Sequence, residues 1–329
     1  MPLLEVDSLR INLLTQRGRA DAVRGLGFSL DQGETLGLIG ESGCGKSITA
    51  MALLGLLPEG SQVSGSIRFG GRELVGMSDQ ELCTIRGNRI GMIFQEPMSA
   101  LNPVHSIGRQ VAEPLRRHRG LPAAEANRQA LALLERVGIP DATRRFDAHP
   151  HQFSGGQRQR ITIAMALACG PDLLIADEPT TALDVTIQKQ ILDLIREIVA
   201  EHGMALLLIS HDLGVIAQNV SRMLVMYGGS VVESGSATAV FGQKTHPYTR
   251  GLFGARPSLQ SPRGQRLATI AGTVPDLVDL PAGCAFAGRC QYTVDACHST
   301  VPLREEITPG HHVACSRLDV VVQDAGNMP

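Results

Sequence analysis

The sequence predicts an α/β fold built on a parallel β-sheet, because strand-like and helix-like runs alternate through most of the chain. Strand-like runs lie at 35–40, 173–177 and 205–210, and each is short, mostly apolar and bounded by polar residues or glycine. Such runs are typical of parallel strands that are buried on both faces. Two further runs, at 48–57 and 186–201, place apolar residues at helical spacing. These helices are expected to cover the faces of the sheet.

Two kinds of segment interrupt the alternating pattern. Weaker strand signals at 3–13, 64–69 and 223–233 indicate antiparallel pieces towards the two ends of the core. A stretch of about 96–160 is rich in arginine, polar and helical in its spacing, and it lies between motifs that belong to the core. We therefore expect an antiparallel β subdomain and an inserted helical subdomain beside the main sheet.

Composition limits the classes of protein to which the chain can belong. The 329 residues are 43% hydrophobic and 19% charged, which excludes wholesale disorder. A formal net charge of −2 and an aromatic content of 3% argue against a nucleic-acid binder, so we expect no nucleic-acid partner. The N-terminus has no signal-peptide pattern, and no apolar run approaches the length of a membrane-spanning helix. We therefore expect a soluble, intracellular protein.

A phosphate-binding motif follows the first strand-like run and precedes the first helix-like run. It has the pattern G-x-x-x-x-G-K-[ST] and consists of Gly40, Glu41, Ser42, Gly43, Cys44, Gly45, Lys46 and Ser47. Glycines let the backbone wrap an anion with its N–H groups pointing inward, and the helix N-terminus adds its positive dipole end. Lys46 is expected to reach the β- and γ-phosphates, and the Ser47 hydroxyl to ligate Mg²⁺. The motif therefore predicts a P-loop NTPase.

Two carboxylates, Asp177 and Glu178, stand at the end of the second strand-like run. A strand buried on both faces delivers its C-terminal residues to the edge of the sheet where ligands bind in α/β folds. We expect Asp177 to hold the Mg²⁺ shell and Glu178 to polarise an attacking water.

Further motifs give the chain a resemblance to a known family. The segment 153–157, Phe-Ser-Gly-Gly-Gln, resembles the LSGGQ signature of ATP-binding cassette (ABC) ATPases, with phenylalanine in the leucine position. Gln95, Asp184 and His211 resemble that family's Q-loop glutamine, D-loop aspartate and switch histidine, and all the motifs occur in family order. Residues 1 to about 240 resemble an ABC ATPase throughout.

The resemblance implies a RecA-like core that works as a dimer. Two ATPase subunits would form a head-to-tail sandwich, with ATP held between the phosphate loop of one subunit and the signature of the other. The signature residues that would contact this nucleotide are Ser154, Gly155, Gly156 and Gln157. Asp184 would complete the site from the D-loop.

The resemblance also implies roles in hydrolysis. Glu178 would act as the catalytic base, and His211 would stabilise the charge of the transition state. Gln95 would sense Mg²⁺ and couple the site to the helical subdomain. Together with Gln95, the oxygens of Ser47 and Asp177 would contact the Mg²⁺.

Two positions depart from the family pattern. Many ABC ATPases stack adenine on an aromatic residue that precedes the phosphate loop, but the segment 15–24 contains none. Val23 or an arginine guanidinium would then pack against the base. Cys44 stands where relatives usually carry serine, which leaves thiol sensitivity or a harmless small side chain as alternatives.

The sequence changes after about residue 255 to a stretch rich in proline, glycine, cysteine and histidine, with little periodicity. We therefore expect an ATPase domain over 1–255 and a C-terminal accessory region over 256–329. Four of the seven cysteines fall in this region, namely Cys284, Cys290, Cys297 and Cys315. In a reducing compartment such a group suits an iron–sulfur cluster or a zinc ion better than disulfides, and free thiols stay open as a third alternative. Three histidines lie nearby as substitute ligands: His298, His311 and His312.

Four segments resemble the oligopeptide/dipeptide importer branch of ABC transporters: 95–103, 245–252, 270–275 and 283–290. With them the resemblance covers nearly the whole chain and implies ATP-driven import of dipeptides or oligopeptides. Some members of this branch carry a [4Fe–4S] cluster in the C-terminal region, so the resemblance implies such a cluster on the four cysteines. Import of another solute, such as a nickel complex, and a non-transport ABC role stay open as alternatives.

The same resemblance implies several partners. Two transmembrane permease subunits, a second and different ABC ATPase subunit, and an extracytoplasmic solute-binding protein would complete the transporter. The chain would then lie at the cytoplasmic face of the inner membrane, held there through the permeases. Because the permeases and the binding protein select the solute, this chain carries almost no information on its identity.

Overall fold

The computed structural model describes residues 1–181, 183–255 and 269–326. Within these residues the chain forms a four-stranded antiparallel sheet and an eight-stranded mixed sheet. The smaller sheet has the strand order β2 (Gly18–Leu30), β1 (Leu4–Thr15), β4 (Gln62–Phe69) and β5 (Arg72–Glu73). It confirms the antiparallel β subdomain expected from the N-terminal strand signals.

The larger sheet forms the centre of the molecule. Its strand order is β11 (Arg304–Thr308), β12 (His311–Ala314), β10 (Ser230–Ser236), β9 (Arg222–Tyr227), β3 (Thr35–Ile39), β8 (Ala205–Ser210), β7 (Leu173–Asp177) and β6 (Ile90–Ile93). The strands from β9 to β6 are parallel, whereas β10, β12 and β11 pair antiparallel. The predicted strands β3, β7 and β8 are confirmed, while the signal at 223–233 divides into the hairpin of β9 and β10.

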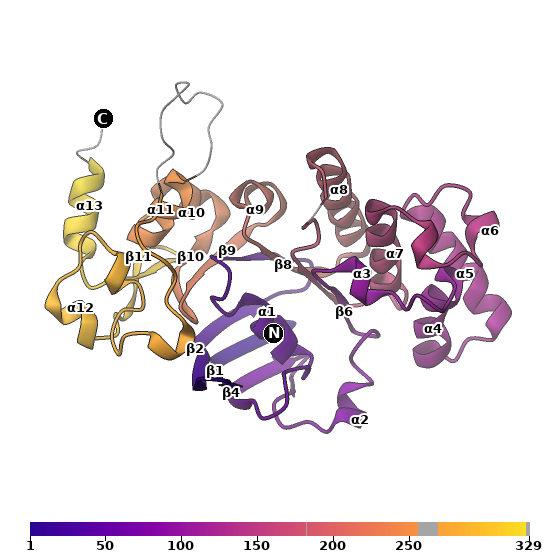
Figure 1. Ribbon diagram of the computed structural model, residues 1–329, viewed down its shortest axis with the longest axis horizontal. Helices are drawn as coiled ribbons and strands as arrows, with labels where there is room; N and C mark the ends of the chain where they lie inside the picture. Colours follow the sequence, from indigo (N-terminus) through magenta and orange to yellow (C-terminus); the bar gives the residue numbers. More distant parts are fainter. Residues whose placement is uncertain (182, 256–268, 327–329) are drawn as a thin grey trace.

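The helices before residue 220 include the predicted α1 and α8. They are α1 (Lys46–Leu53), α2 (Asp79–Leu82), α3 (Pro97–Ala100), α4 (Ile107–Arg119), α5 (Ala123–Arg136), α6 (Ala142–Arg145), α7 (Gly155–Leu167), α8 (Val185–His202) and α9 (Leu213–Asn219), with the 3-10 turn η1 (Pro150–Gln152). Helices α3 to α7 gather at one end of the molecule in Figure 1, where the sequence predicts the inserted helical subdomain.

The remaining helices and 3-10 turns belong to the C-terminal third of the chain. They are α10 (Ala237–Gln243), α11 (Pro247–Gly254), η2 (Leu277–Asp279), η3 (Ala287–Arg289), α12 (Asp295–Ser299) and α13 (Leu318–Gly326). Figure 1 places helices α10 to α13 at the end of the molecule opposite to α4 and α5. No helix in the described ranges combines the length and the apolar character that a bilayer crossing requires.

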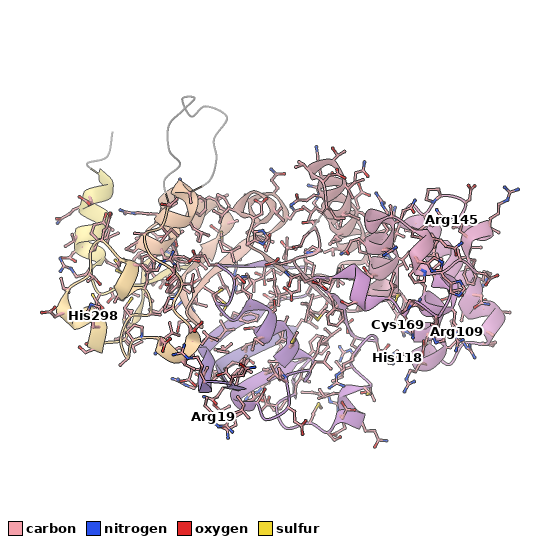
Figure 2. All side chains as sticks on the ribbon, viewed as in Figure 1. Arg19, Arg109, His118, Arg145, Cys169 and His298 are labelled. Atoms are coloured by element: carbon pink, nitrogen blue, oxygen red, sulfur yellow. The ribbon has the colours of Figure 1, made fainter. Side chains whose placement is uncertain are left out.

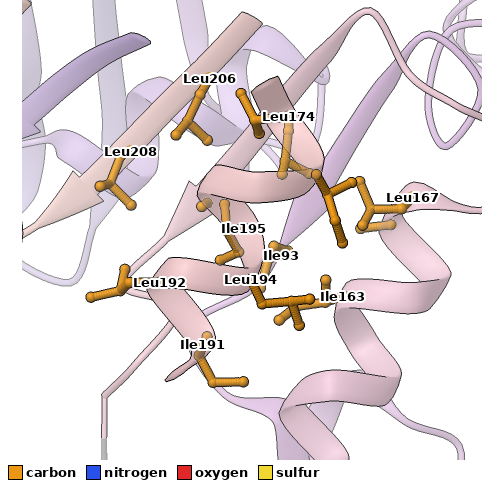
Figure 3. Packing of buried hydrophobic residues seen from close by; sticks show 14 of the residues in the cluster. Ile93, Ile163, Leu167, Leu174, Ile191, Leu192, Leu194, Ile195, Leu206 and Leu208 are labelled. Atoms are coloured by element: carbon orange, nitrogen blue, oxygen red, sulfur yellow. The ribbon is translucent and has the colours of Figure 1, made fainter. Parts of the chain in front are cut away.

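Alternating side chains divide the core into two layers, one on each face of the larger sheet. In β7, Leu174 joins the layer beneath α7 and α8, while Leu173 and Ile175 join the layer shared with α1 and the smaller sheet. Figure 3 shows the first layer, in which Leu206 and Leu208 of β8 face the apolar side of α8. This period of two, with both faces covered, explains why the strand is apolar along its whole length.

The C-terminal region extends the main sheet. Strand β12 pairs with β10, and β11 pairs with β12, so the region adds two strands to the core sheet. Their short sequences carry no clear period, which is why sequence alone predicts no strand there. The predicted boundary at residue 255 falls next to residues outside the described ranges, so the division into 1–255 and 256–329 stays a prediction.

One buried carboxylate joins this region to the core. Glu233 of β10 is fully buried, and it accepts hydrogen bonds from the backbone N–H groups of Thr245 and His246, each at 2.9 Å. The Nε2 atom of His311 on β12 lies 2.8 Å from the same carboxylate. Burial alone would raise the pKa of Glu233, but these hydrogen bonds outweigh it and lower the pKa.

Candidate functional site

Four neighbouring parallel strands bring the motif loops to one edge of the larger sheet. The strands β3, β8, β7 and β6 lie side by side in that order. At their carboxyl ends follow Gly40, His211, Glu178 and, after one intervening residue, Gln95. Since carboxyl ends of parallel strands meet at the same edge, residues up to 171 positions apart in the chain share one site.

The phosphate loop turns tightly between β3 and α1. Gly45 has a φ of 102°, and a Cβ atom there would lie 2.4 Å from the carbonyl oxygen of Ala22, so only glycine fits. Lys46 is almost fully buried, and its ammonium donates to the carbonyl oxygens of Gly40 at 2.8 Å and Glu41 at 3.1 Å. The cation is therefore held inside the loop where the motif predicts phosphate binding.

The Ser47 hydroxyl donates to Oδ1 of Asp177 at 3.1 Å, which joins the phosphate loop to the end of β7. Asp177 is almost fully buried, and this burial raises the pKa of its carboxyl, against the opposing effects of Ser47 and Lys46. A hydroxyl and a carboxylate beside a phosphate loop are the oxygen donors that Mg²⁺ prefers. These residues therefore fit the predicted ion.

The carboxylate of Glu178 contacts two other residues predicted from the sequence, Gln95 and His211, and one that is not predicted, Thr181. The side-chain amide of Gln95 donates to its Oε2 at 3.0 Å, and the hydroxyl of Thr181 donates to the same oxygen at 3.0 Å. Nδ1 of His211 lies 3.2 Å from its Oε1. Thr181 is not predicted from the sequence, where its only signal is a hydroxyl three residues after Glu178.

The signature residues lie elsewhere on the molecule. Ser154 caps α7, because its hydroxyl accepts from the backbone N–H of Gln157 while the Gln157 side chain accepts from the N–H of Ser154. Asp184 caps α8, because its carboxylate accepts from the backbone N–H groups of Thr186 and Ile187.

Signature and D-loop line one surface pocket of about 720 Å³ that includes Gly155, Gly156 and Leu183, and no residue of the phosphate loop lines it. A Cβ atom on Gly156 would approach the Ile187 side chain to 2.9 Å, so the signature packs closely on α8. Within one subunit the signature is therefore separate from the phosphate loop.

The burial of Val23 and Cys44 bears on two questions that the sequence leaves open: which residue packs against adenine, and whether Cys44 is a reactive thiol. Val23 is fully buried in the core, so it cannot face adenine, which corrects one of the two suggestions made for the base. Cys44 is 1% exposed, and its burial raises the pKa of the thiol. A buried thiol with little thiolate is poorly reactive, so Cys44 fits the harmless alternative better than thiol sensitivity.

The four C-terminal cysteines share one small pocket. Cys284, Cys290, Cys297 and Cys315 all line a pocket of about 20 Å³ beside His246 and Phe286. Burial raises the pKa of Cys290 to about 11 and also raises the pKa of Cys284 and Cys315.

Thiols are the donors that an iron–sulfur cluster requires, but the four thiols of this pocket are not placed to hold a metal ion. Within residues 1–181, 183–255 and 269–326, no group of three or more His, Cys, Asp or Glu side chains is positioned to hold a metal ion. His311 pairs with Glu233, and His298 is exposed on α12 at the outer side of the C-terminal region (Figure 2). The predicted [4Fe–4S] cluster therefore has no support from the geometry.

The C-terminal region also reaches the phosphate loop, which no motif predicts. The guanidinium of Arg289 donates to both carboxylate oxygens of Glu41, at 2.7 Å and 3.2 Å, and only 6% of the Arg289 side chain is exposed. The backbone N–H of Glu41 donates to the hydroxyl of Tyr248 at 2.8 Å. Two residues of the last third of the chain therefore hold one residue of the loop.

Comparison with known families accounts for both parts of the chain. A family described as ABC transporter matches residues 23–181, and one described as oligopeptide/dipeptide transporter, C-terminal region, matches residues 232–297. The oligopeptide transport ATP-binding protein OppD of Salmonella typhimurium is 48% identical over 313 residues, which are 95% of this chain and 93% of the relative. The dipeptide transport ATP-binding protein DppD of Bacillus subtilis is 48% identical over 315 residues, covering 95% and 94%.

Solved structures agree with these relatives. The dimeric post-hydrolysis structure of the ATP-binding cassette MJ0796 bound to ADP and Pi superimposes with a TM-score of 0.64 at 26% identity. It covers 71% of this chain and 98% of that chain. The fold is thus that of an ABC ATPase cassette, and the chain belongs to the ABC transporter family, among the ATP-binding proteins that carry the oligopeptide/dipeptide transporter C-terminal region.

Proposed function

We propose that this chain is the ATP-hydrolysing subunit that energises import of dipeptides or oligopeptides through a membrane ABC transporter. The observation that best supports ATP hydrolysis is the position of the Glu178 carboxylate beside the phosphate loop. It accepts hydrogen bonds from Gln95 and Thr181 and lies next to His211. The relatives named for oligopeptide and dipeptide transport, together with the matched C-terminal region, support peptides as the solute.

Nucleotide binding would depend on the phosphate loop. The inward backbone N–H groups of residues 40–47 and the ammonium of Lys46 would hold the β- and γ-phosphates. Ser47 and Asp177, whose oxygens are 3.1 Å apart, would hold Mg²⁺ together with Gln95. When bound, the ion would neutralise charge on the phosphate oxygens.

Hydrolysis would depend on the group around Glu178. Its carboxylate would accept a proton from the water that attacks the γ-phosphorus, while the bond from that phosphorus to the leaving ADP oxygen breaks. Thr181 and Gln95 would hold the carboxylate in place through the hydrogen bonds on Oε2. His211, on the other oxygen, would donate a hydrogen bond to the developing charge on the phosphoryl group.

The signature would complete the site of a second subunit. Ser154, Gly155 and Gly156 line a pocket without phosphate-loop residues, as expected if they serve a nucleotide held by the partner. Asp184, at the same pocket, would lie at the subunit boundary. ATP would then close a head-to-tail dimer, and hydrolysis would open it.

The proposed transporter includes two transmembrane permease subunits, a second and different ABC ATPase subunit, and an extracytoplasmic solute-binding protein. This chain would be peripheral to the membrane, at the cytoplasmic face of the inner membrane through contact with the permeases. The relatives named as oligopeptide and dipeptide transport ATP-binding proteins support a place for this chain in a transporter.

A [4Fe–4S] cluster on Cys284, Cys290, Cys297 and Cys315 stays a hypothesis that rests on the resemblance of the C-terminal region to the importer branch, since these four thiols line one pocket but are not placed to hold a metal ion. No step of the proposed mechanism passes through it. Iron analysis and visible absorbance of anaerobically purified protein test it. About four iron atoms per chain with broad visible absorbance would support the cluster, whereas zinc alone or metal-free protein would exclude it.

The solute is tested by stimulation of ATP hydrolysis in reconstituted transporters. The chain is incorporated with its permeases, its second ATPase subunit and the binding protein, which is then loaded with a dipeptide, an oligopeptide or a nickel complex. We expect stimulation by the peptide-loaded binding protein. Stimulation by the nickel complex alone would replace peptides with another solute, and recovery of the native chain with ribosomes or DNA instead of permeases would contradict a transport role.

A further inference from the structure

A cavity of about 520 Å³ adjoins the phosphate loop. Three separate parts of the chain line it: the β1–β2 hairpin at 15–17 and Ala20, the loop residues Ser42 and Gly43, and the C-terminal segment 274–278. Its volume lies within the range of about 300–1,000 Å³ that is usual for small-molecule sites. The cavity is therefore large enough for the part of ATP that the phosphate loop does not hold.

The position of the catalytic group shows which end of ATP this cavity would take. The γ-phosphate must approach Ser47, Asp177 and Glu178, where the predicted Mg²⁺ and the attacking water meet. None of these three residues lines the cavity, although Ser42 and Gly43 of the same loop do. A nucleotide held along the loop would thus have its base, not its γ-phosphate, in the cavity.

We propose that the C-terminal segment 274–278 forms the wall against which the adenine of ATP packs. Val274, Pro275 and Leu277 supply apolar surface, and no Phe, Tyr or Trp lines the cavity. An adenine face is apolar and gains free energy when such side chains remove it from water. The accessory region therefore replaces, within the same chain, the aromatic side chain that is missing before the phosphate loop.

Arg17 of the β1–β2 turn also lines the cavity and contacts the C-terminal region. Its guanidinium donates to Asp276 at 2.7 Å and to both carboxylate oxygens of Asp279 at 2.7 and 2.8 Å. These ion pairs are exposed, so they contribute little to stability. They fix the geometry, because they join the β1–β2 turn to the segment that forms the wall.

Arg289 joins the chain just before this segment to the phosphate loop. While two of its nitrogens bind the Glu41 carboxylate, its Nε donates to the carbonyl oxygen of Ala271 at 2.9 Å. One guanidinium thus links Ala271, three residues before the wall, to the loop that holds the phosphates. A bidentate pair of this kind sets orientation as well as distance, which makes Arg289 a positioning residue for the base site.

The wall is tested by comparing ATP with tripolyphosphate, which has the phosphates but no base. Calorimetry on the full chain measures both for the wild type, for Leu277→Asn, and for the matched control Leu303→Asn. Leu303 is an exposed leucine of the same region that does not line the cavity. We expect Leu277→Asn to weaken ATP binding by about tenfold and to leave tripolyphosphate binding unchanged, whereas the control changes neither.

An unchanged affinity for ATP in Leu277→Asn, or an equal loss for both ligands, would overturn the proposal, since the second result indicates a damaged phosphate loop. A second measurement needs no variant: photolabelling of the wild-type chain with 8-azido-ATP, followed by peptide mapping. Label within 274–278 supports the wall. Label found only in residues before 255 contradicts it.

Discussion

Glu178 shows most clearly how one residue joins distant parts of this chain. It has a φ of 47°, a conformation that a non-glycine residue adopts only where its surroundings impose it. Its backbone N–H donates to the carbonyl oxygen of Ile209 at 2.9 Å, and its side chain binds Gln95, Thr181 and His211. The strained residue is therefore also the one at the centre of the candidate site.

Replacement of Glu178 by glutamine tests its role as the base. An amide cannot accept the proton of the attacking water, so we expect ATP turnover to fall by about 100-fold or more while ATP binding persists. Steady-state ATPase assays and calorimetry measure the two effects. Glu201→Gln, which removes an exposed carboxylate paired with Arg136, is the control and should turn over normally. Normal turnover in Glu178→Gln would exclude the assignment.

Thr181 tests whether the geometry of that carboxylate matters. Thr181→Ala removes one hydrogen bond on Oε2 of Glu178, and we expect kcat to fall by about tenfold, the effect of roughly one net hydrogen bond. KM for ATP should stay the same, because the phosphate loop is untouched. Thr181→Ser keeps the hydroxyl and should restore kcat. An alanine variant with unchanged kcat would show that Thr181 does not position Glu178.

At the scale of elements, the sheet edge could be predicted because its signals are local. Each of β3, β7 and β8 is a short apolar run, and each is followed directly by residues of the candidate site. The contacts between elements could not be predicted in the same way. Arg289 and Glu41 lie 248 positions apart, and the sequence around each residue gives no sign that the two form an ion pair.

The Arg289–Glu41 pair makes a prediction about how the C-terminal region affects catalysis. Arg289→Lys keeps the charge but loses the bidentate geometry, so the phosphate loop and the base wall are no longer fixed to each other. We expect KM for ATP to rise about five- to tenfold with kcat nearly unchanged, because the group around Glu178 is intact.

Full ATPase kinetics measure this split between KM and kcat. Arg68→Lys, which alters an exposed pair with Glu5, is the matched control and should change neither constant. A fall in kcat with no change in KM for Arg289→Lys would contradict a positioning role at the base site.

Across the molecule, the C-terminal region is joined to the ATPase core by strand pairing and by ion pairs. Strand β12 pairs with β10, Arg289 binds Glu41, and Arg17 binds Asp276 and Asp279. Sequence alone indicates a cysteine-rich stretch and a family resemblance there, but none of these contacts, because they leave no periodic pattern. The C-terminal region therefore contacts the phosphate loop directly as well as extending the main sheet.

Glu233 makes this junction sensitive to acid. Its pKa is lowered in the folded chain, so its contribution to stability is full above the unfolded value of about 4.3 and is lost as the pH falls through the lower folded value. Glu233→Gln should lose about 2 kcal/mol of stability at neutral pH, and this difference should shrink as the pH falls below about 4.

Urea denaturation of the wild type and of Glu233→Gln at several pH values measures the difference in their free energies of unfolding. Glu305→Gln, at an exposed carboxylate on β11, is the control and should match the wild type. A loss of stability for Glu233→Gln that is the same at every pH would contradict a role for the charge.

We propose that ATP hydrolysis at the Glu178 site drives peptide import. Uptake of a labelled peptide into proteoliposomes measures this coupling. The vesicles contain the chain with its permeases, second ATPase subunit and binding protein, and uptake is measured with ATP on the side of the ATPase subunits. We predict ATP-dependent peptide accumulation with the wild-type chain and none above background with Glu178→Gln. Equal accumulation with both chains, or none with the wild type in vesicles that hydrolyse ATP, would contradict the claim.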